Sequence, residues 1–208
     1  MALQDYDVRP INSTVGKEFI REHHYTHGVH NGPMCYGLFD GGNALVGVIA
    51  FATPSSENVC ASVFGSEFKR SVTELHRLVI LDSAPKNGES FLIARALKML
   101  HRDRPKYVAV LSFADWTEGH LGIIYQATNA IYTGTSARAT FYRDDAGRLR
   151  HPRQNGVNIT KKMALDRGWE PVARDGKHRY LYLLPTGKAE RRLWSSRLLL
   201  KSLEYPKA

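Results

Sequence analysis

The 208-residue chain has only two cysteines and no long hydrophobic run. Cys35 and Cys60 belong to no Cys-x-x-Cys motif, so we expect both to be reduced and buried. The longest apolar run, Ala44 to Ala52, is far shorter than the roughly 20 residues that cross a bilayer. The opening residues, MALQDYDV, include acidic side chains and no apolar stretch, unlike a secretory signal. These absences predict an intracellular protein without a membrane span or a disulfide.

Acidic side chains in the second half of the chain are outnumbered two to one by basic ones. Residues 1–104 contain 11 Lys or Arg and 11 Asp or Glu, whereas residues 105–208 contain 18 and 9, so the whole formal charge of +9 lies in the second half. One-sided positive charge is typical of proteins that bind a polyanion, because each neutralised phosphate releases a condensed counterion. A solubilising surface is the alternative, since charge asymmetry alone does not name a ligand.

The length and the 43% hydrophobic content predict one folded domain that needs no disulfide or metal to be stable. A strand–helix–strand unit in the middle requires parallel pairing, so we expect an α/β fold with a mixed central sheet flanked by helices. We expect Thr14 to cap the first helix and a polar loop to follow the hairpin. The hydrophobic pattern predicts helices over 14–24, 88–101 and 119–129, and strands over 34–39, 44–51, 74–81, 107–113, 131–133 and 180–184.

Positive charge is concentrated between residues 136 and 174. We interpret this segment as a basic insertion or flap, with two helical turns over 160–167, and expect a C-terminal helix over 188–203. The residues expected to contact DNA phosphates are Arg138, Arg143, Arg148, Arg150, Arg153, Lys161, Lys162, Lys177 and Arg179.

Polar residues follow the buried strand over 107–113. Ser112 and Asp115 lie at its carboxyl end, where open α/β sheets place ligand-binding groups. Tyr125, in the next short helix, is followed by Tyr132, Thr133 and Gly134, an order that resembles the ending of Gcn5-related N-acetyltransferases. The resemblance implies that Tyr125 protonates a departing coenzyme A thiolate. The alternative is a core tyrosine with a satisfied hydroxyl group.

The loop Lys86 to Ser90 precedes a predicted helix. Backbone N–H groups at a helix N-terminus bind a pyrophosphate well, and acetyltransferases hold coenzyme A there. This loop lacks the usual Arg/Gln-x-x-Gly-x-Gly/Ala pattern, and an ordinary helix cap explains it equally well. The residues expected around the cofactor are Leu78, Val79, Ile80, Asn87, Gly88, Glu89, Ser90 and Asn129.

Four histidines lie between positions 23 and 30. His23 and His27 have the i, i+4 spacing of metal ligands, but no cysteine or carboxylate follows at a matching distance and Gly28 interrupts the helix, so we predict no metal. We expect His24 and Tyr25 to line a substrate pocket; solvated histidines at a helix end are the alternative.

Several segments together resemble the Mom family of phage DNA modification proteins, a branch of the acetyltransferase fold. They are HHYTH, CYGLFDGGNALVGVIAF, ELHRLVILD, NGESFLIARALKML, SFADWTEGHLGIIYQATNAIYTGT and KHRYLYLL, in order over residues 20–184. The resemblance implies conversion of adenine in double-stranded DNA to N6-carbamoylmethyladenine, which blocks host restriction, in the cytoplasm of the host bacterium. It implies an active site of His24, Tyr25, Glu74, Arg77, Ser112, Asp115, His120 and Tyr125, with acetyl-coenzyme A or a related thioester as donor.

Adenine N6 is a poor nucleophile, and the base must leave the helix stack before an enzyme reaches it. We expect Tyr25, Tyr36, Phe113 or Trp116 to stack on it. A carbamoylmethyl group attaches through its methylene carbon and contains nitrogen, so acetyl-coenzyme A alone cannot supply it. The rival hypotheses are an acetyltransferase for a small-molecule or protein amine, and a non-catalytic DNA-binding protein. The chain has no helix-turn-helix or zinc-finger pattern to support the latter.

Overall fold

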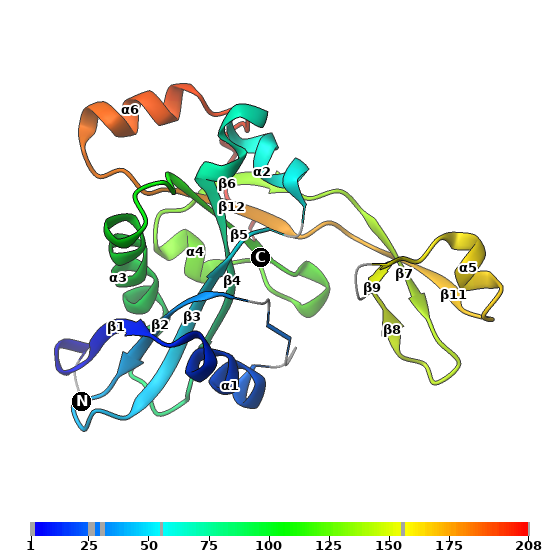
Figure 1. Cartoon of the computed structure of the whole chain (residues 1–208), viewed down its shortest axis with the longest axis horizontal. Helices are drawn as coiled ribbons and strands as arrows, with labels where there is room; N and C mark the ends of the chain where they lie inside the picture. Colours follow the sequence, from blue (N-terminus) through cyan, green and yellow to red (C-terminus); the bar gives the residue numbers. More distant parts are fainter. Residues whose placement is uncertain (1–2, 25–27, 30–31, 55, 155–156, 208) are drawn as a thin grey trace.

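A seven-stranded mixed sheet forms the centre of the molecule (Figure 1). The computed structural model describes residues 3–24, 28–29, 32–54, 56–154 and 157–207. Neighbouring strands are antiparallel except β4 and β5, which are parallel and are joined by α3 (Gly88–Asp103). The predicted α/β fold is thereby confirmed. In spatial order the strands are β1 (Asp7–Ile11), β2 (Met34–Phe39), β3 (Leu45–Ala52), β4 (Val72–Ile80), β5 (Ala109–Ala114), β12 (His178–Leu183) and β6 (Ile131–Thr135).

Helices cover both faces of this sheet because side chains alternate between the faces along each strand. On β3, Ile49 and Phe51 pack with Leu92 of α3, whereas Val48 and Ala50 pack with Ile20 on the opposite face. Both cysteines are free and buried, as expected. The remaining helices of the main body are α1 (Ser13–His23), α2 (Glu57–Phe64), α4 (Ile123–Ala127) and α6 (Lys188–Ser196), with short 3-10 turns η1 (Leu3–Asp5), η2 (Ser66–Ser71) and η3 (Trp116–Glu118).

Local side-chain chemistry sets several element boundaries. The cap of α1 is Asn12, whose side chain accepts a hydrogen bond from the Thr14 N–H at 2.8 Å, so the prediction of Thr14 as the cap is wrong. The predicted β2–β3 hairpin is confirmed: the Asp40 carboxylate accepts the N–H groups of Gly42 and Ala44, and Asn43 adopts a φ of 66°. The expected polar loop after the hairpin instead contains α2.

Residues 136–177 form a separate structure, which we call the basic lobe. It extends from the ends of β6 and β12 (Figure 1) and has its own small core of Tyr142, Ile159 and Ala164. A three-stranded sheet in the order β11-β7-β8 organises it. Its elements are β7 (Ala139–Arg143), β8 (Leu149–Arg150), β9 (Arg153–Gln154), β10 (Val157–Asn158), α5 (Lys161–Leu165) and β11 (Glu170–Arg174).

The chain after α6 is extended, so the prediction of one helix over 188–203 is wrong beyond Ser196. The Leu199 N–H donates to Val63 O, and the Leu203 N–H donates to Tyr132 O, both at 2.9 Å. Leu198 and Leu200 both pack against the α2 side of the core. Their spacing of two residues is the period at which side chains of an extended chain return to the same face. In the part of the chain that the structure describes, no helix is long and apolar enough to cross a membrane.

Two glycines before α4 offer a matched test of packing at this point. Gly119 and Gly122 have φ values of 75° and 76°, but a Cβ at Gly119 meets nothing within 4 Å, whereas one at Gly122 meets the ring of Tyr180. We predict that Gly119→Ala costs about 1–2 kcal/mol of backbone strain. Gly122→Ala should cost about 1–3 kcal/mol more, from overpacking. Urea unfolding of both variants measures the difference, and equal losses would contradict the assigned contact.

Candidate functional site

Two parallel strands diverge in the middle of the sheet and open a cavity. The pairing of β4 with β5 covers Val72–Leu75 and ends where Leu75 lies opposite Ser112, although β4 continues beside β3 to Ile80. A register shift opposite β3 makes His76 the extra residue of a β-bulge. Beyond Leu75, residues His76–Ile80 of β4 line a cavity of about 960 Å³. The cavity therefore lies where β4 continues beyond the end of its pairing with β5.

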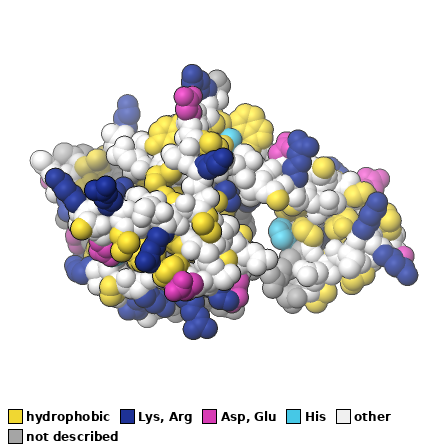
Figure 2. Space-filling view, turned by 90° about the horizontal axis from the view of Figure 1, so that it is seen from above, with side chains coloured by type: hydrophobic (Ala, Val, Ile, Leu, Met, Phe, Trp, Pro, Cys, Tyr) yellow, Lys and Arg dark blue, Asp and Glu magenta, His cyan; other side chains and the backbone are white. Residues whose placement is uncertain are grey.

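The cavity brings together most of the predicted catalytic and cofactor-binding residues that the structure describes. It lies between the main body and the basic lobe, and Figure 2 shows the open notch between them. The predicted residues that line it are His24, Glu74, Arg77, Leu78, Val79, Ile80, Glu89, Asp115, His120, Tyr125 and Lys177, with Phe113 as the aromatic side chain expected to stack. The lobe adds Phe141, His151 and Arg174, which sequence patterns did not indicate.

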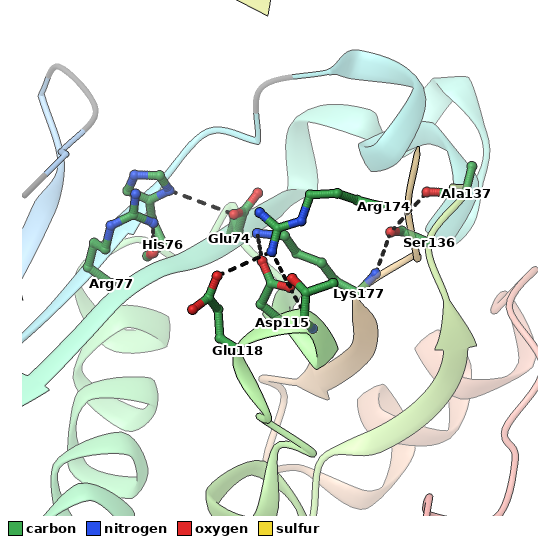
Figure 3. A network of polar contacts seen from close by, with 10 residues as sticks. Glu74, His76, Arg77, Asp115, Glu118, Ser136, Ala137, Arg174 and Lys177 are labelled. Carbon is green, nitrogen blue, oxygen red and sulfur yellow. Dashed lines mark hydrogen bonds and ion pairs between the residues drawn. The ribbon is translucent and has the colours of Figure 1, made fainter. Parts of the chain in front are cut away.

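Asp115 is the centre of a polar network at the cavity wall (Figure 3). Its carboxylate accepts the Thr117 N–H at 3.1 Å and lies 3.1 Å from Lys177 Nζ and 3.5 Å from Arg174. Arg174 also pairs with Glu118 at 3.2 Å. Burial by itself raises the pKa of Asp115, but hydrogen bonds and positive charges from its partners outweigh burial and hold that pKa below its usual value. Asp115 is thus a carboxylate that ties the lobe to the main body.

A second polar group lies on β4. Glu74 Oε1 is 3.7 Å from His76 Nδ1, and both side chains are largely buried. Arg77 donates from Nε to Gly28 O at 2.8 Å and from a terminal nitrogen to His76 O at 2.6 Å. Arg77 therefore fastens the segment after α1 to the bulged strand, next to His24 at the end of that helix. Tyr125, on α4, is buried and its ring centroid lies 5.3 Å from that of Tyr180.

Other predicted site residues lie outside the cavity wall. Ser112 is fully buried, and its Oγ has no hydrogen-bond partner among the described residues. The Gly88 N–H donates to Pro85 O at 3.0 Å. It is therefore not available to a phosphate, contrary to the expectation that Gly88 contacts the cofactor. Asn129 is exposed after α4 with a φ of 59°, which favours an asparagine. Asn87 and Ser90 lie at the start of α3, also outside the wall.

The structure describes some, but not all, of the aromatic residues predicted to stack on a base and of the histidines considered as metal ligands. Tyr36 is buried in the core and donates to Asp103 at 3.4 Å, so the expectation that it stacks on a base is wrong. Tyr25 and His27 lie outside the described residues. His23 packs edge-on against Phe19, with ring centroids 4.6 Å apart. Across the described ranges, no group of three His, Cys, Asp or Glu side chains is placed to hold a metal ion.

Some of the cations predicted to contact DNA form ion pairs within the protein, and others are exposed on the lobe. Arg148 and Arg150 pair with Asp144 at 3.1 and 2.6 Å, and Arg138 pairs with Asp175 at 2.9 Å while remaining 82% exposed. Arg179 donates to the Thr133 hydroxyl and carbonyl at 2.9 and 3.0 Å, which joins β12 to β6. The DNA contact expected of Arg179 stays a prediction. Arg143, Lys161 and Lys162 are exposed on the lobe; the Arg153 side chain lies outside the described structure.

Comparison with known proteins adds relatives by sequence and by fold. The model of the Mom protein family matches residues 5–207. The chain is 30% identical over 211 residues to the methylcarbamoylase mom of Escherichia phage Mu, covering 96% of this chain and 83% of that protein. A mutant spermidine N-acetyltransferase from Vibrio cholerae superposes with a TM-score of 0.50 at 12% identity, covering 87% of this chain and 95% of that one. A chimera of the Vibrio cholerae enzyme with hSSAT also gives 0.50, at 11% identity and coverages of 91% and 99%. The fold is that of these acetyltransferases, as expected.

The low pKa of Asp115 predicts a defined pH dependence of stability. Its folded pKa lies below the unfolded value of about 3.9, so the stabilisation is complete above that pH and is lost as pH falls through the folded pKa. Asp115→Asn should be less stable than the parent from pH 7 down to about pH 4.5, with the gap closing below about pH 4. Urea unfolding across this range measures the gap.

Glu118→Gln is the matched control, because this half-exposed carboxylate shares Arg174 with Asp115. Exposed ion pairs contribute about 0–1 kcal/mol, so this variant should change stability little. If Asp115→Asn lost no more stability than Glu118→Gln, the carboxylate would not hold the lobe in place.

Proposed function

The chain belongs to the Mom protein family, and we propose that it is a DNA modification enzyme that places a carbamoylmethyl group on N6 of adenine. The modified DNA would resist host restriction enzymes, and the reaction would take place in the cytoplasm of the host bacterium. One observation carries the proposal: a single cavity is lined both by the free edge of β4 and by Arg174 and Lys177 of the basic lobe. A site for group transfer and a site for a polyanion are thus continuous.

The charge of the lobe supports DNA as the acceptor. Residues 136–177 contain 10 Lys or Arg and 5 Asp or Glu. Several of these cations, including Arg143, Lys161 and Lys162, are exposed. Contacts between such cations and phosphates supply affinity and position the duplex without reading its sequence.

The cavity is large enough for a base that has left the helix. Its volume of about 960 Å³ lies at the upper end of the range of about 300–1,000 Å³ for small-molecule sites. Phe113 and Phe141 supply aromatic surface on which a base can stack. Extrusion of a base costs a few kcal/mol, which stacking and hydrogen bonds in the pocket offset.

The proposed reaction requires a proton acceptor near N6 and a proton donor near the leaving group. A bond forms between N6 and the methylene carbon, N6 loses one proton, and the bond from that carbon to its leaving group breaks. His24 and His120 line the cavity, and an imidazole is well suited to accept a proton near neutral pH. Tyr125 lies in the same wall and is the proposed donor to the leaving group.

The proposed donor is a coenzyme A derivative or another small carrier whose leaving atom is bonded directly to the methylene carbon; a thioester would react at its carbonyl carbon and would need a further step. Backbone groups of β4 beyond Leu75 can pair with the amides of an extended carrier arm, as in strand addition. At the start of α3, a pyrophosphate would rely on first-turn N–H groups such as those of Glu89 and Ser90, beside the Glu89 carboxylate. Acetyl-coenzyme A lacks the nitrogen of the product, so another molecule must supply it.

We predict that expression of the protein adds C2H3NO to a fraction of the deoxyadenosine in the host's DNA. Mass spectrometry of enzymatically digested DNA detects this nucleoside, and cells carrying a His24→Ala, Tyr125→Phe double variant are the control. The rival hypothesis, an acetyltransferase for small or protein amines, predicts acetylated amines and unmodified adenine. Unmodified DNA from cells with abundant folded protein would contradict the proposed function.

Tyr125→Phe isolates the proton transfer to the leaving group. The ring still packs against Tyr180, so folding and binding should persist, while turnover should fall about 100-fold or more. Tyr182→Phe is a matched control, because that phenol is buried and bonded to Thr128. Full activity of Tyr125→Phe would remove the phenol from the mechanism.

A further inference from the structure

A second cavity lies beside the first and has no part in the proposed transfer step. Its volume is about 400 Å³, and Leu121, Ser136 and Asp175 line both cavities. The 3-10 turn η3 and the loop after it separate the two, since Trp116 lines the second cavity and His120 lines the first. The two cavities therefore lie next to each other and share part of their wall, so two adjacent parts of one ligand can occupy them.

Trp116 gives the second cavity an aromatic surface. Trp116 is 49% exposed, which is unusual for so large an apolar residue. The ring of His178 meets the indole edge-on, with centroids 5.8 Å apart and planes at 86°, and the Tyr132 hydroxyl is 2.8 Å from His178 Nδ1. The indole is thus supported from the sheet while about half of it stays open to a ligand.

Two cations complete the wall. Arg138 remains 82% exposed although it pairs with Asp175, and Lys207 is exposed near the end of the chain. The extended tail after α6 brings Lys207 here, held by the hydrogen bond from the Tyr205 hydroxyl to Ala130 O at 2.8 Å. An aromatic platform with flanking cations is the combination that binds one nucleotide of a single strand.

We propose that the second cavity holds the nucleotide next to the target adenine on the same strand, with its base stacked on Trp116 and a phosphate held by Arg138 and Lys207. This proposal rests on the proposed function, because it requires an adenine of DNA in the large cavity. A neighbouring base held here would also lie outside the helix stack, and its stacking on Trp116 would keep the flipped adenine from returning. Stacking tolerates any base, so this subsite would position the strand with little sequence preference.

The test uses a short thymine oligonucleotide with one central adenine, and two versions that lack the base on its 5′ or its 3′ side. Trp116→Ala should bind the intact strand roughly 5- to 150-fold more weakly than the parent, as expected for one lost stacking contact. Trp116→Phe should recover most of this loss. One of the two base-deficient strands should bind the parent protein more weakly by a similar factor, with no further loss in Trp116→Ala.

Leu149→Ala is the matched control, since it removes an exposed apolar side chain of the lobe away from both cavities. Lys207→Gln should reduce the slope of log affinity against log salt by about 0.7, the value for one phosphate contact to a single strand. If Trp116→Ala binds and modifies the intact strand as the parent does, the proposed subsite is wrong and the proposed function stands. If the parent protein binds none of these single strands but modifies duplex DNA, the proposed subsite is wrong and the proposed function stands; if it also leaves duplex DNA unmodified, both proposals fail.

Discussion

The divergence of β4 from β5 is the constraint on which the site depends. The two parallel strands share four paired positions, from Val72 opposite Ala109 to Leu75 opposite Ser112, and then separate. The separation leaves a polar strand edge bordering a cavity, and the loop that follows β5 supplies Asp115, His120 and, on α4, Tyr125. Without the split, these groups would border a continuous sheet, and no space would exist for a donor and an acceptor to meet.

The basic lobe adds a second wall to the cavity, opposite the wall that the acetyltransferase-like fold of the main body provides. It is inserted between β6 and β12, of which β12 is the neighbour of β5, and its base is tied to the main body by the ion pairs of Asp115 with Lys177 and Arg174. A carboxylate with two cationic partners in a largely buried position is costly to break, so this cluster limits how the lobe moves. The same cations line the cavity, which places positive charge at its entrance.

Local patterns predicted the elements whose side chains alternate or repeat clearly, such as the β2–β3 hairpin, the buried strand β5 and helix α3. Strand β1 was missed because it is an edge strand with charged residues and Pro10, and only Val8 is buried. Helix α2 has eight residues and is stabilised mainly by packing of Cys60 and Val63. The lobe's contribution to the cavity was not predictable, because Arg174 and Asp115 lie far apart in the sequence and meet only through the fold of the lobe.

The central claim is that an adenine of DNA enters the cavity between the main body and the basic lobe. Its most direct test is the structure of the protein bound to a DNA duplex that contains a modifiable adenine. We expect that adenine to lie outside the helix stack within the cavity, with N6 directed toward His24 or His120 and with phosphates along the lobe. DNA bound to another face, with every adenine stacked in the duplex, would contradict the account.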